Sequence, residues 1–337
     1  MIADVWDSLR SDNGQSSGVV MRRVLPEAPI DVFAAMRKPR NVPMLVVEMP
    51  TKDLSLSFPT SSRGFSVSVA PTEPGPMGRV AVELELADPA GEPVFMALVD
   101  DAISRVEGAA DSNSAAAEFS HALARWQAFF RIHAFDGLTK EQQQGLFGEL
   151  LFLRMRATTA GSAEAAVRAW SGPSGSNQDF EWQGHAFEVK TTASNPLTAV
   201  RISNLRQLDD GCVESLHLVV IEVERHENGS QTLPQSVEAT RALIAESAPQ
   251  VAFDFAERLI DYGYLDQHAM HYAGTGYGVR AVRAFEVAEG FPRLIESDMP
   301  NGVGDVHYAI ALAAITDFEV EDAAMMEQMR KWFGELG

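Results

Sequence analysis

Residues 177–190 decide the fold, and they read NQDFEWQGHAFEVK. Gln183 and Gly184 stand between two apolar stretches, which is the pattern of a β-hairpin with a two-residue turn. In the register that this turn imposes, Phe180 lies opposite Phe187. The segment therefore predicts two short antiparallel strands, the second of which continues through an apolar run.

The same register places Asp179 opposite Glu188, so that two carboxylates meet across the hairpin. Side chains alternate between the two faces of a strand, and Glu181 and Lys190 therefore share the face of this pair. Like charges directly opposite each other destabilise a sheet, and a divalent cation between them would remove the repulsion. The other face is apolar and is predicted to be buried; it carries Phe180, Trp182, Phe187 and Val189.

Carboxylates, a backbone carbonyl and waters form an all-oxygen site that suits Mg²⁺ or Mn²⁺ better than zinc. Lys190 is one of only five lysines among 27 basic residues. Its compact ammonium could polarise an attacking water, a task for which a broad guanidinium is less suited. The alternative is that Asp179, Glu188 and Lys190 form a solvated hairpin face, with a surface salt bridge worth ~0–1 kcal/mol.

A helix precedes the hairpin. Thr139 and Gln142 have the spacing of a capping box, and apolar residues at helical spacing follow through Leu153. Glu149 lies on this predicted helix, where it either faces the carboxylate pair or is an ordinary exposed residue.

The rest of the chain divides into three predicted parts: a β-rich domain at 1–115, a core at 116–230 and an acidic α+β region at 231–337. The division rests on turn-forming clusters and on the small, polar stretch at 109–117. Further strands are predicted at 44–49, 54–58, 65–69, 80–86, 186–189, 216–223, 279–287 and 306–315, and helices around Leu123 and Trp126 and at 163–170, 236–246 and 253–262.

The net charge of −20 is distributed unevenly along the chain. Residues 1–115 carry 10 basic and 16 acidic side chains, residues 116–208 carry 9 and 8, and residues 209–337 carry 8 and 23. A polyanion could approach only the middle part, where the net charge is +1, because the last part at −15 would repel it. The acidic last part is interpreted as a solvated or partner-facing surface.

The chain has no run of ~18 uncharged apolar residues and no signal-like N-terminus, which predicts a soluble, cytoplasmic protein. The single cysteine, Cys212, excludes an internal disulfide and is expected to be a small buried hydrophobe. His268 and His271 could reach one metal, but they have no evident third ligand and are expected at the surface. His185 is interpreted as a residue packed at the hairpin end near Trp182.

The pattern Asp179, eight residues, Glu188-Val189-Lys190 resembles the PD-(D/E)XK signature of restriction-endonuclease-like nucleases. Three further stretches narrow the resemblance to a bacterial family named for that motif, often encoded beside DNA methyltransferases and ATPases of phage-defence islands. The first is the helix segment GLFGEL at 145–150. The others are WSGP at 170–173 and ISNLRQL at 202–208, and similarity extends to FPRLI at 291–295. Gln178 stands where the name-giving motif has proline, a position that varies widely.

The resemblance implies an α/β fold, in which a mixed sheet flanked by helices forms a restriction-endonuclease-like core. It implies that Asp179, Glu188 and the carbonyl of Val189 are metal ligands, that Glu149 completes the site and that Lys190 serves the attacking water. Gln207 matches a polar position on a helix after the motif strands, although Ser203 and Gln207 could merely cap and solvate that helix. The candidate contacts to DNA are Arg154, Arg201, Ser203, Arg206 and Gln207.

These observations predict a Mg²⁺- or Mn²⁺-dependent endonuclease that hydrolyses DNA in a bacterial restriction or phage-defence system. A methyltransferase or ATPase of that system is a possible partner, and the chain could be an oligomer. The alternative is a non-catalytic subunit that keeps the nuclease fold and holds DNA or a partner protein. A plain interaction scaffold would account for the charge but not for the paired carboxylates.

Overall fold

The computed structural model describes residues 2–12, 14, 16–53, 62–72, 78–227, 229, 231–321, 323–325, 327 and 330. They form two compact units, Met1–Gly137 and Leu138–Gly337. The strand predicted at 54–58 lies outside the described residues. No described helix has both the length and the apolar character that crossing a bilayer demands.

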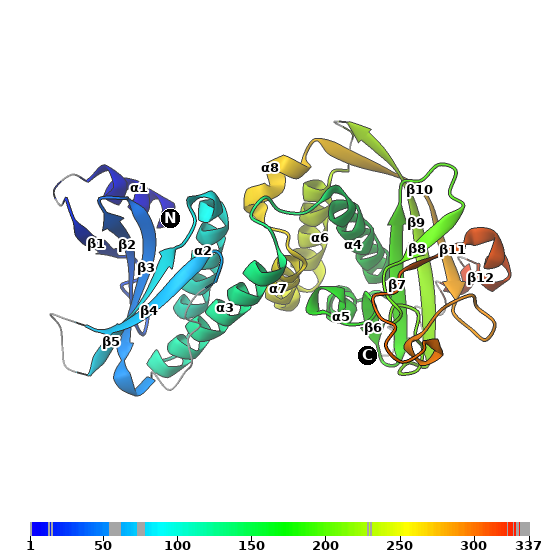
Figure 1. The fold of residues 1–337 in the computed structure, drawn as a ribbon, viewed down its shortest axis with the longest axis horizontal. Coiled ribbons are helices and arrows are strands. Elements are labelled where there is room, and N and C mark those ends of the chain that lie inside the picture. Colours follow the sequence, from blue (N-terminus) through cyan, green and yellow to red (C-terminus); the bar gives the residue numbers. More distant parts are fainter. Residues whose placement is uncertain are drawn as a thin grey trace. The chain divides into compact units, whose positions relative to one another are not determined.

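The first unit is a five-stranded antiparallel sheet with helices beside it (Figure 1). Its strands lie in the order β1-β2-β3-β5-β4. The central strands β3 and β5 carry runs of buried apolar residues, among which Val47 and Val82 are fully buried. The sequence analysis predicted three of these strands and α3 but not α2. The elements are α1 (Ile2–Ser11), β1 (Gly18–Arg23), β2 (Asp31–Lys38), β3 (Val42–Pro50), β4 (Phe65–Pro71), β5 (Arg79–Leu86), α2 (Glu92–Glu107) and α3 (Ser112–Ile132).

The second unit contains a mixed five-stranded sheet in the order β12-β10-β9-β7-β6. β6 and β7 are antiparallel, whereas β7 and β9 are parallel. A separate two-stranded sheet pairs β8 with β11. The strands are β6 (Phe180–Trp182), β7 (His185–Thr192), β8 (Ala199–Ile202), β9 (Ser215–Glu227), β10 (Thr275–Glu286), β11 (Tyr308–Ala311) and β12 (Glu319–Val320).

Helices cover one face of this mixed sheet, and the β8–β11 pair covers the other (Figure 1). The helices are α4 (Lys140–Ala160), α5 (Ala163–Ala169), α6 (Leu233–Ser247), α7 (Ala252–Tyr262) and α8 (Ala269–Tyr272). Short 3₁₀ turns occur in both units, at Thr51–Asp53, Pro89–Gly91, Gly172–Ser174, Pro249–Val251, Asp266–His268, Glu296–Asp298, Leu312–Ala314 and Thr316–Phe318.

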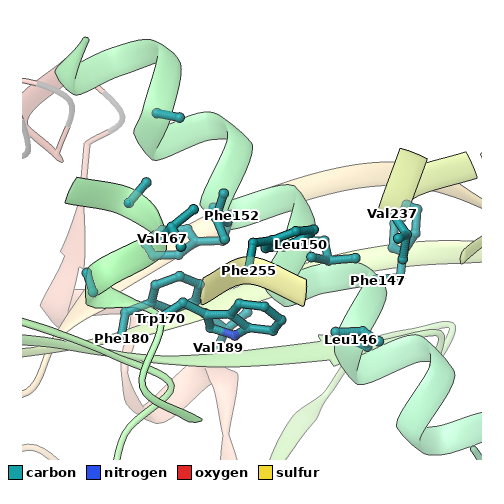
Figure 2. Packing of buried hydrophobic residues seen from close by; sticks show 14 of the residues in the cluster. Leu146, Phe147, Leu150, Phe152, Val167, Trp170, Phe180, Val189, Val237 and Phe255 are labelled. Atoms are coloured by element: carbon teal, nitrogen blue, oxygen red, sulfur yellow. The ribbon is translucent and has the colours of Figure 1, made fainter. Parts of the chain in front are cut away.

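The larger core lies between the helices and the sheet. Leu150 of α4, Trp170 after α5 and Phe255 of α7 pack there against Phe180 and Val189 of the hairpin (Figure 2). A second core on the opposite face includes Ala186, Leu218 and Ile310. Both faces of β7 are covered in its central part, where Ala186, Phe187, Glu188 and Val189 are all buried.

The structure confirms the predicted α/β class with a mixed sheet flanked by helices. The units divide after Gly137, whereas the sequence analysis placed boundaries near 115 and 230. The first of these falls at the start of α3, inside the first unit. The second falls inside the second unit, because β10 pairs along β9 and extends the same sheet.

Candidate active site

The β6–β7 hairpin has the register that the sequence predicts. Phe180 pairs with Phe187, and Trp182 pairs with His185. The turn residues Gln183 and Gly184 both have positive φ, 47° and 83°, as a two-residue turn with the twist of a hairpin requires. The side chain of Asp179, just before β6, accepts a hydrogen bond from the backbone N–H of Val189 through Oδ2, at 2.8 Å.

Glu188 is a buried carboxylate on the central part of β7. Only 1% of the residue is exposed, and its Oε1 lies 2.6 Å from Nζ of Lys190. Its Oε2 has no hydrogen-bond donor among the described residues. Burial raises the pKa of Glu188 to about 8, and the charge of Asp179 adds to this effect while Lys190 opposes it. This face of β7 is therefore covered, whereas the sequence analysis expected burial only on the apolar face.

Lys190 is the cation that these acidic groups share. Burial by itself would lower its pKa, but the charges of Glu188, Asp179 and Glu149 outweigh burial and hold the pKa above its usual value. Asp179 also has a raised pKa, because burial outweighs the attraction of Lys190 and the hydrogen bond from Val189. Three acidic side chains thus surround one ammonium group.

Glu149 is held on α4 by neighbours that its sequence position does not reveal. The predicted capping box is present, since Thr139 Oγ1 accepts from the N–H of Gln142. Glu149 Oε2 accepts a hydrogen bond from Trp170 Nε1 at 2.7 Å, and the hydroxyl of Tyr262 also hydrogen-bonds to its side chain. Burial and the charge of Asp179 raise the pKa of Glu149 well above its usual value. Glu149 is therefore buried beside the other acidic groups and is not an exposed helix residue.

These residues fit a divalent cation in charge and in donor type. Among the described residues, Lys190 is the cation that pairs with this group of Glu149, Asp179 and Glu188, and a buried oxygen of Glu188 has no donor there. Hard cations prefer such carboxylate oxygens. Within the described parts of the chain, however, no three His, Cys, Asp or Glu side chains converge closely enough to hold one ion. An ion here would take further ligands from the backbone and from water.

Arg154, one of the predicted DNA contacts, is partly buried and hydrogen-bonds to α6. Its Nη1 donates hydrogen bonds to the carbonyl and hydroxyl of Ser236, at 2.9 Å each, and to the hydroxyl of Thr240, at 2.8 Å. These contacts tie α4 to the first turns of α6. The spacing of residues along α4 gave no indication of this partner, which is 82 residues away in the sequence.

The segment 203–208 forms turns and not the predicted helix. The amide oxygen of Gln207 accepts from the N–H of Ser203 at 2.8 Å, which closes a local loop. Arg206 is exposed and pairs with Glu296 at 2.6 Å. Asn204 accepts from the N–H of Arg206, at 2.9 Å, so polar side chains satisfy this backbone without a helical ladder.

Arg201 lies where a DNA contact would be useful. It is exposed on β8 and lines a cleft of about 580 Å³ that Lys190 also lines. Gln144 and Arg225, which the sequence analysis did not single out, line the same cleft. The pairing of distant strands and the packing of α4 bring these side chains together, and no local signal in the sequence indicates them.

Two minor predictions are wrong. Cys212 is exposed. It lines a surface cavity of about 770 Å³ beside the hairpin turn, together with His185. His268 is buried, with 3% exposed, and its ring stacks on His271 with centroids 5.8 Å apart. His185 lies at the hairpin end, as predicted, and its Nδ1 is 2.9 Å from the hydroxyl of Ser215.

Comparisons with known proteins identify a family for this chain. The model of a family described as "Putative PD-(D/E)XK family member, (DUF4420)" matches residues 2–313, which is nearly the whole chain. No curated protein and no solved structure matches the chain. The match covers both compact units and includes every residue of the hairpin and of α4.

Proposed function

The chain belongs to the PD-(D/E)XK family DUF4420, and from this membership we propose that it is a metal-dependent endonuclease that hydrolyses phosphodiester bonds in DNA. The observation that supports the proposal best is the buried surplus of acidic side chains around Lys190. Burying unbalanced carboxylates is costly. A fold that keeps three of them beside one lysine has a use for the negative charge.

The ligands in this proposal are Asp179 and Glu188, with the carbonyl of Val189 as a third and Glu149 as the residue that completes the site. Mg²⁺ or Mn²⁺, when bound, would neutralise charge on the phosphate and supply an acidified water. The chain's own part is to hold the oxygens in place. Val189 N–H orients Asp179, and Trp170 Nε1 orients Glu149.

Lys190 is proposed as the residue that serves the attacking water. Its ammonium has three N–H donors, and it pairs with Glu188 through one of them. The remaining donors can hydrogen-bond to the water and to an oxygen of the phosphate, because Lys190 also lines the cleft beside β8. An ammonium at this position stabilises negative charge that develops on the phosphate during in-line attack.

The wider role in this proposal is a bacterial restriction or phage-defence system in the cytoplasm, with a methyltransferase or an ATPase as possible partners. Its support is the charge distribution, since the net charge of −20 disfavours DNA binding by most of the surface. The antiparallel sheet of the first unit and the acidic last part would then serve target selection or assembly.

A second candidate function is that of a non-catalytic subunit that keeps the fold. The observation that favours it is the ion pair between Lys190 and Glu188, which partly balances the buried charge without any metal. In that case the acidic side chains would be structural, and their removal would affect assembly or stability but not DNA cleavage.

A cleavage assay separates these functions. Wild type, Asp179→Ala and Lys190→Ala would be incubated with plasmid, linear and methylated DNA and Mg²⁺ or Mn²⁺, alone and in the complete defence system. We expect each variant to lose activity on the order of 10²–10³-fold or more. Calorimetry should show loss of metal binding in Asp179→Ala but its retention in Lys190→Ala.

Arg37→Ala, on the sheet of the first unit, is the matched control, and it should cleave as wild type does. If both site variants restrict phage and cleave DNA as well as the control does, the nuclease proposal is wrong and the non-catalytic subunit takes its place.

A further inference from the structure

The cleft beside Lys190 differs from the rest of the surface in its charge. It is lined by Lys190 of β7, Arg201 of β8 and Arg225 near the end of β9, with Glu141 as its only acidic lining residue. Lys190 is already paired with Glu188, so the local excess of positive charge in this chain of net charge −20 comes from Arg201 and Arg225. Such an excess attracts phosphate groups.

The buried side chain of Gln144 orients the guanidinium of Arg225. Its Nε donates to Oε1 of Gln144 at 2.9 Å, and Gln144 Nε2 donates to the carbonyl of Thr191 at 2.6 Å. Gln144 has only 7% of its surface exposed. The amide thus links Arg225 to the residue that directly follows Lys190, and it leaves both terminal nitrogens of the guanidinium available.

Neither Arg201 nor Arg225 has an acidic partner among the described residues. Most other arginines of the two sheets do, as in the pair of Arg283 with Glu319 at 2.6 Å and the pair of Arg37 with Glu85 at 2.8 Å. Both unpaired arginines are exposed. A guanidinium that is held at Nε and unpaired at its other nitrogens has the fork geometry that binds a phosphate through two hydrogen bonds.

We propose that this cleft is a phosphate-binding site in which Arg225, positioned by Gln144, binds the DNA backbone next to the phosphate at Lys190, and Arg201 binds it from β8. The inference rests on the proposed function and deepens it, because it assigns the path of the substrate strand. The N-terminal end of α4, which carries Gln144, adds a favourable dipole for an anion.

The test measures binding of a short fluorescent DNA duplex at several salt concentrations, without divalent metal so that cleavage is not needed. Arg225→Gln and Arg201→Gln should each weaken binding about tenfold. Each should also lower the slope of log affinity against log salt by about 1. Gln144→Leu keeps the charge of Arg225 but frees its orientation, so it should weaken binding with a smaller change in slope.

Arg283→Gln is the control, because it removes the same charge from the neighbouring strand β10 and does not line the cleft. Equal affinities of Arg225→Gln and Arg283→Gln would overturn the proposal, as would failure of wild type to bind the duplex at low salt. The same measurement is made with an RNA duplex. If Arg225→Gln weakens binding of the RNA duplex but not of the DNA duplex, the assignment of the cleft to DNA is wrong. If Arg225→Gln lowers affinity but wild type never cleaves in the complete system, the cleft stands and the nuclease function fails.

Discussion

The two five-stranded sheets both place one cation among acidic side chains, but in different surroundings. On β2 of the first unit, Arg37 pairs with Glu83 at 3.3 Å and with Glu85 at 2.8 Å, and all three side chains are 26–40% exposed. On β7 of the second unit, Lys190 and Glu188 are 17% and 1% exposed. Asp179 and Glu149 add two further acidic groups to this second cluster.

The difference supports the proposal that the cluster on β7 is functional and that the cluster on β2 is structural. Water screens the exposed cluster, so that its pairs contribute ~0–1 kcal/mol each and little is lost if one is removed. Burying the second cluster costs free energy, because one lysine does not fully offset the desolvation of the acidic groups. Selection for stability alone would not retain it, which is the physical reason for assigning the chemistry to β7 and not to the sheet of the first unit.

The largest expected effect of a single buried histidine on stability is the acid-induced loss that His217 contributes to the second unit. Burial lowers the pKa of His217 to about 4, and an unfolded histidine titrates near 6.5. Between these values the unfolded state binds more protons, so stability falls as the pH falls, by about 3 kcal/mol in total. The described histidines of the first unit, His121 and His133, are not buried.

Hydrogen exchange between pH 7 and 4, followed separately in the two units, checks this expectation. The raised pKa values of Glu149, Asp179 and Glu188 act in the opposite direction, so the comparison is between wild type and His217→Gln. As the pH falls through this window, protection of the second unit should fall in wild type relative to His217→Gln, while the first unit should behave alike in both proteins. An identical pH dependence of the second unit in the two proteins would contradict the contribution of the buried His217.

A smaller effect is expected from two glycines that lie against side chains. A methyl group at Gly148 of α4 would overlap the hydroxyl and Cβ of Thr191, and one at Gly64 would overlap the ring of Phe130. Alanine at either position should cost about 1–3 kcal/mol, because the neighbours must move. Only Gly148→Ala should also reduce cleavage, since Thr191 directly follows Lys190.

Thermal denaturation measures the loss of stability in the two glycine variants. Cleavage well below the melting temperature measures the loss of activity. If Gly64→Ala reduces cleavage as much as Gly148→Ala, loss of stability and not displacement of β7 explains both.

The smallest effect should have opposite signs in the two clusters. Glu149 has a raised pKa in the fold. Above the unfolded pKa near 4.5 its carboxyl therefore destabilises the protein increasingly with rising pH. Glu149→Gln should gain about 1 kcal/mol at pH 8 while losing metal affinity, whereas Glu85→Gln should lose ~0–1 kcal/mol.

Urea denaturation at pH 6 and pH 8 and calorimetry with Mn²⁺ provide the two readings. A loss of stability in Glu149→Gln that does not depend on pH would identify Glu149 as a structural residue held by Trp170.

The sequence predicted those parts of the site that depend on local rules. The Gln183–Gly184 turn sets the hairpin register, and the Thr139 capping box sets the start of α4. The period of each strand or helix then predicts which of its side chains share one face. The predicted helix at 203–208 failed because the side chains of Asn204 and Gln207 bond to the local backbone instead.

What the sequence by itself determined is the hairpin, its facing carboxylates and the lysine two residues beyond, because a two-residue turn and a period of two leave no freedom. Only the tertiary structure decided which charges are buried and which cations meet. The parallel pairing of β7 with β9 brings Arg225 to the site, the packing of α4 brings Gln144 there, and the end of α5 places Trp170 beside Glu149. These contacts join residues far apart in the chain, so no local sequence pattern predicts them. They form only when the helices and strands pack into the two cores on either side of β7.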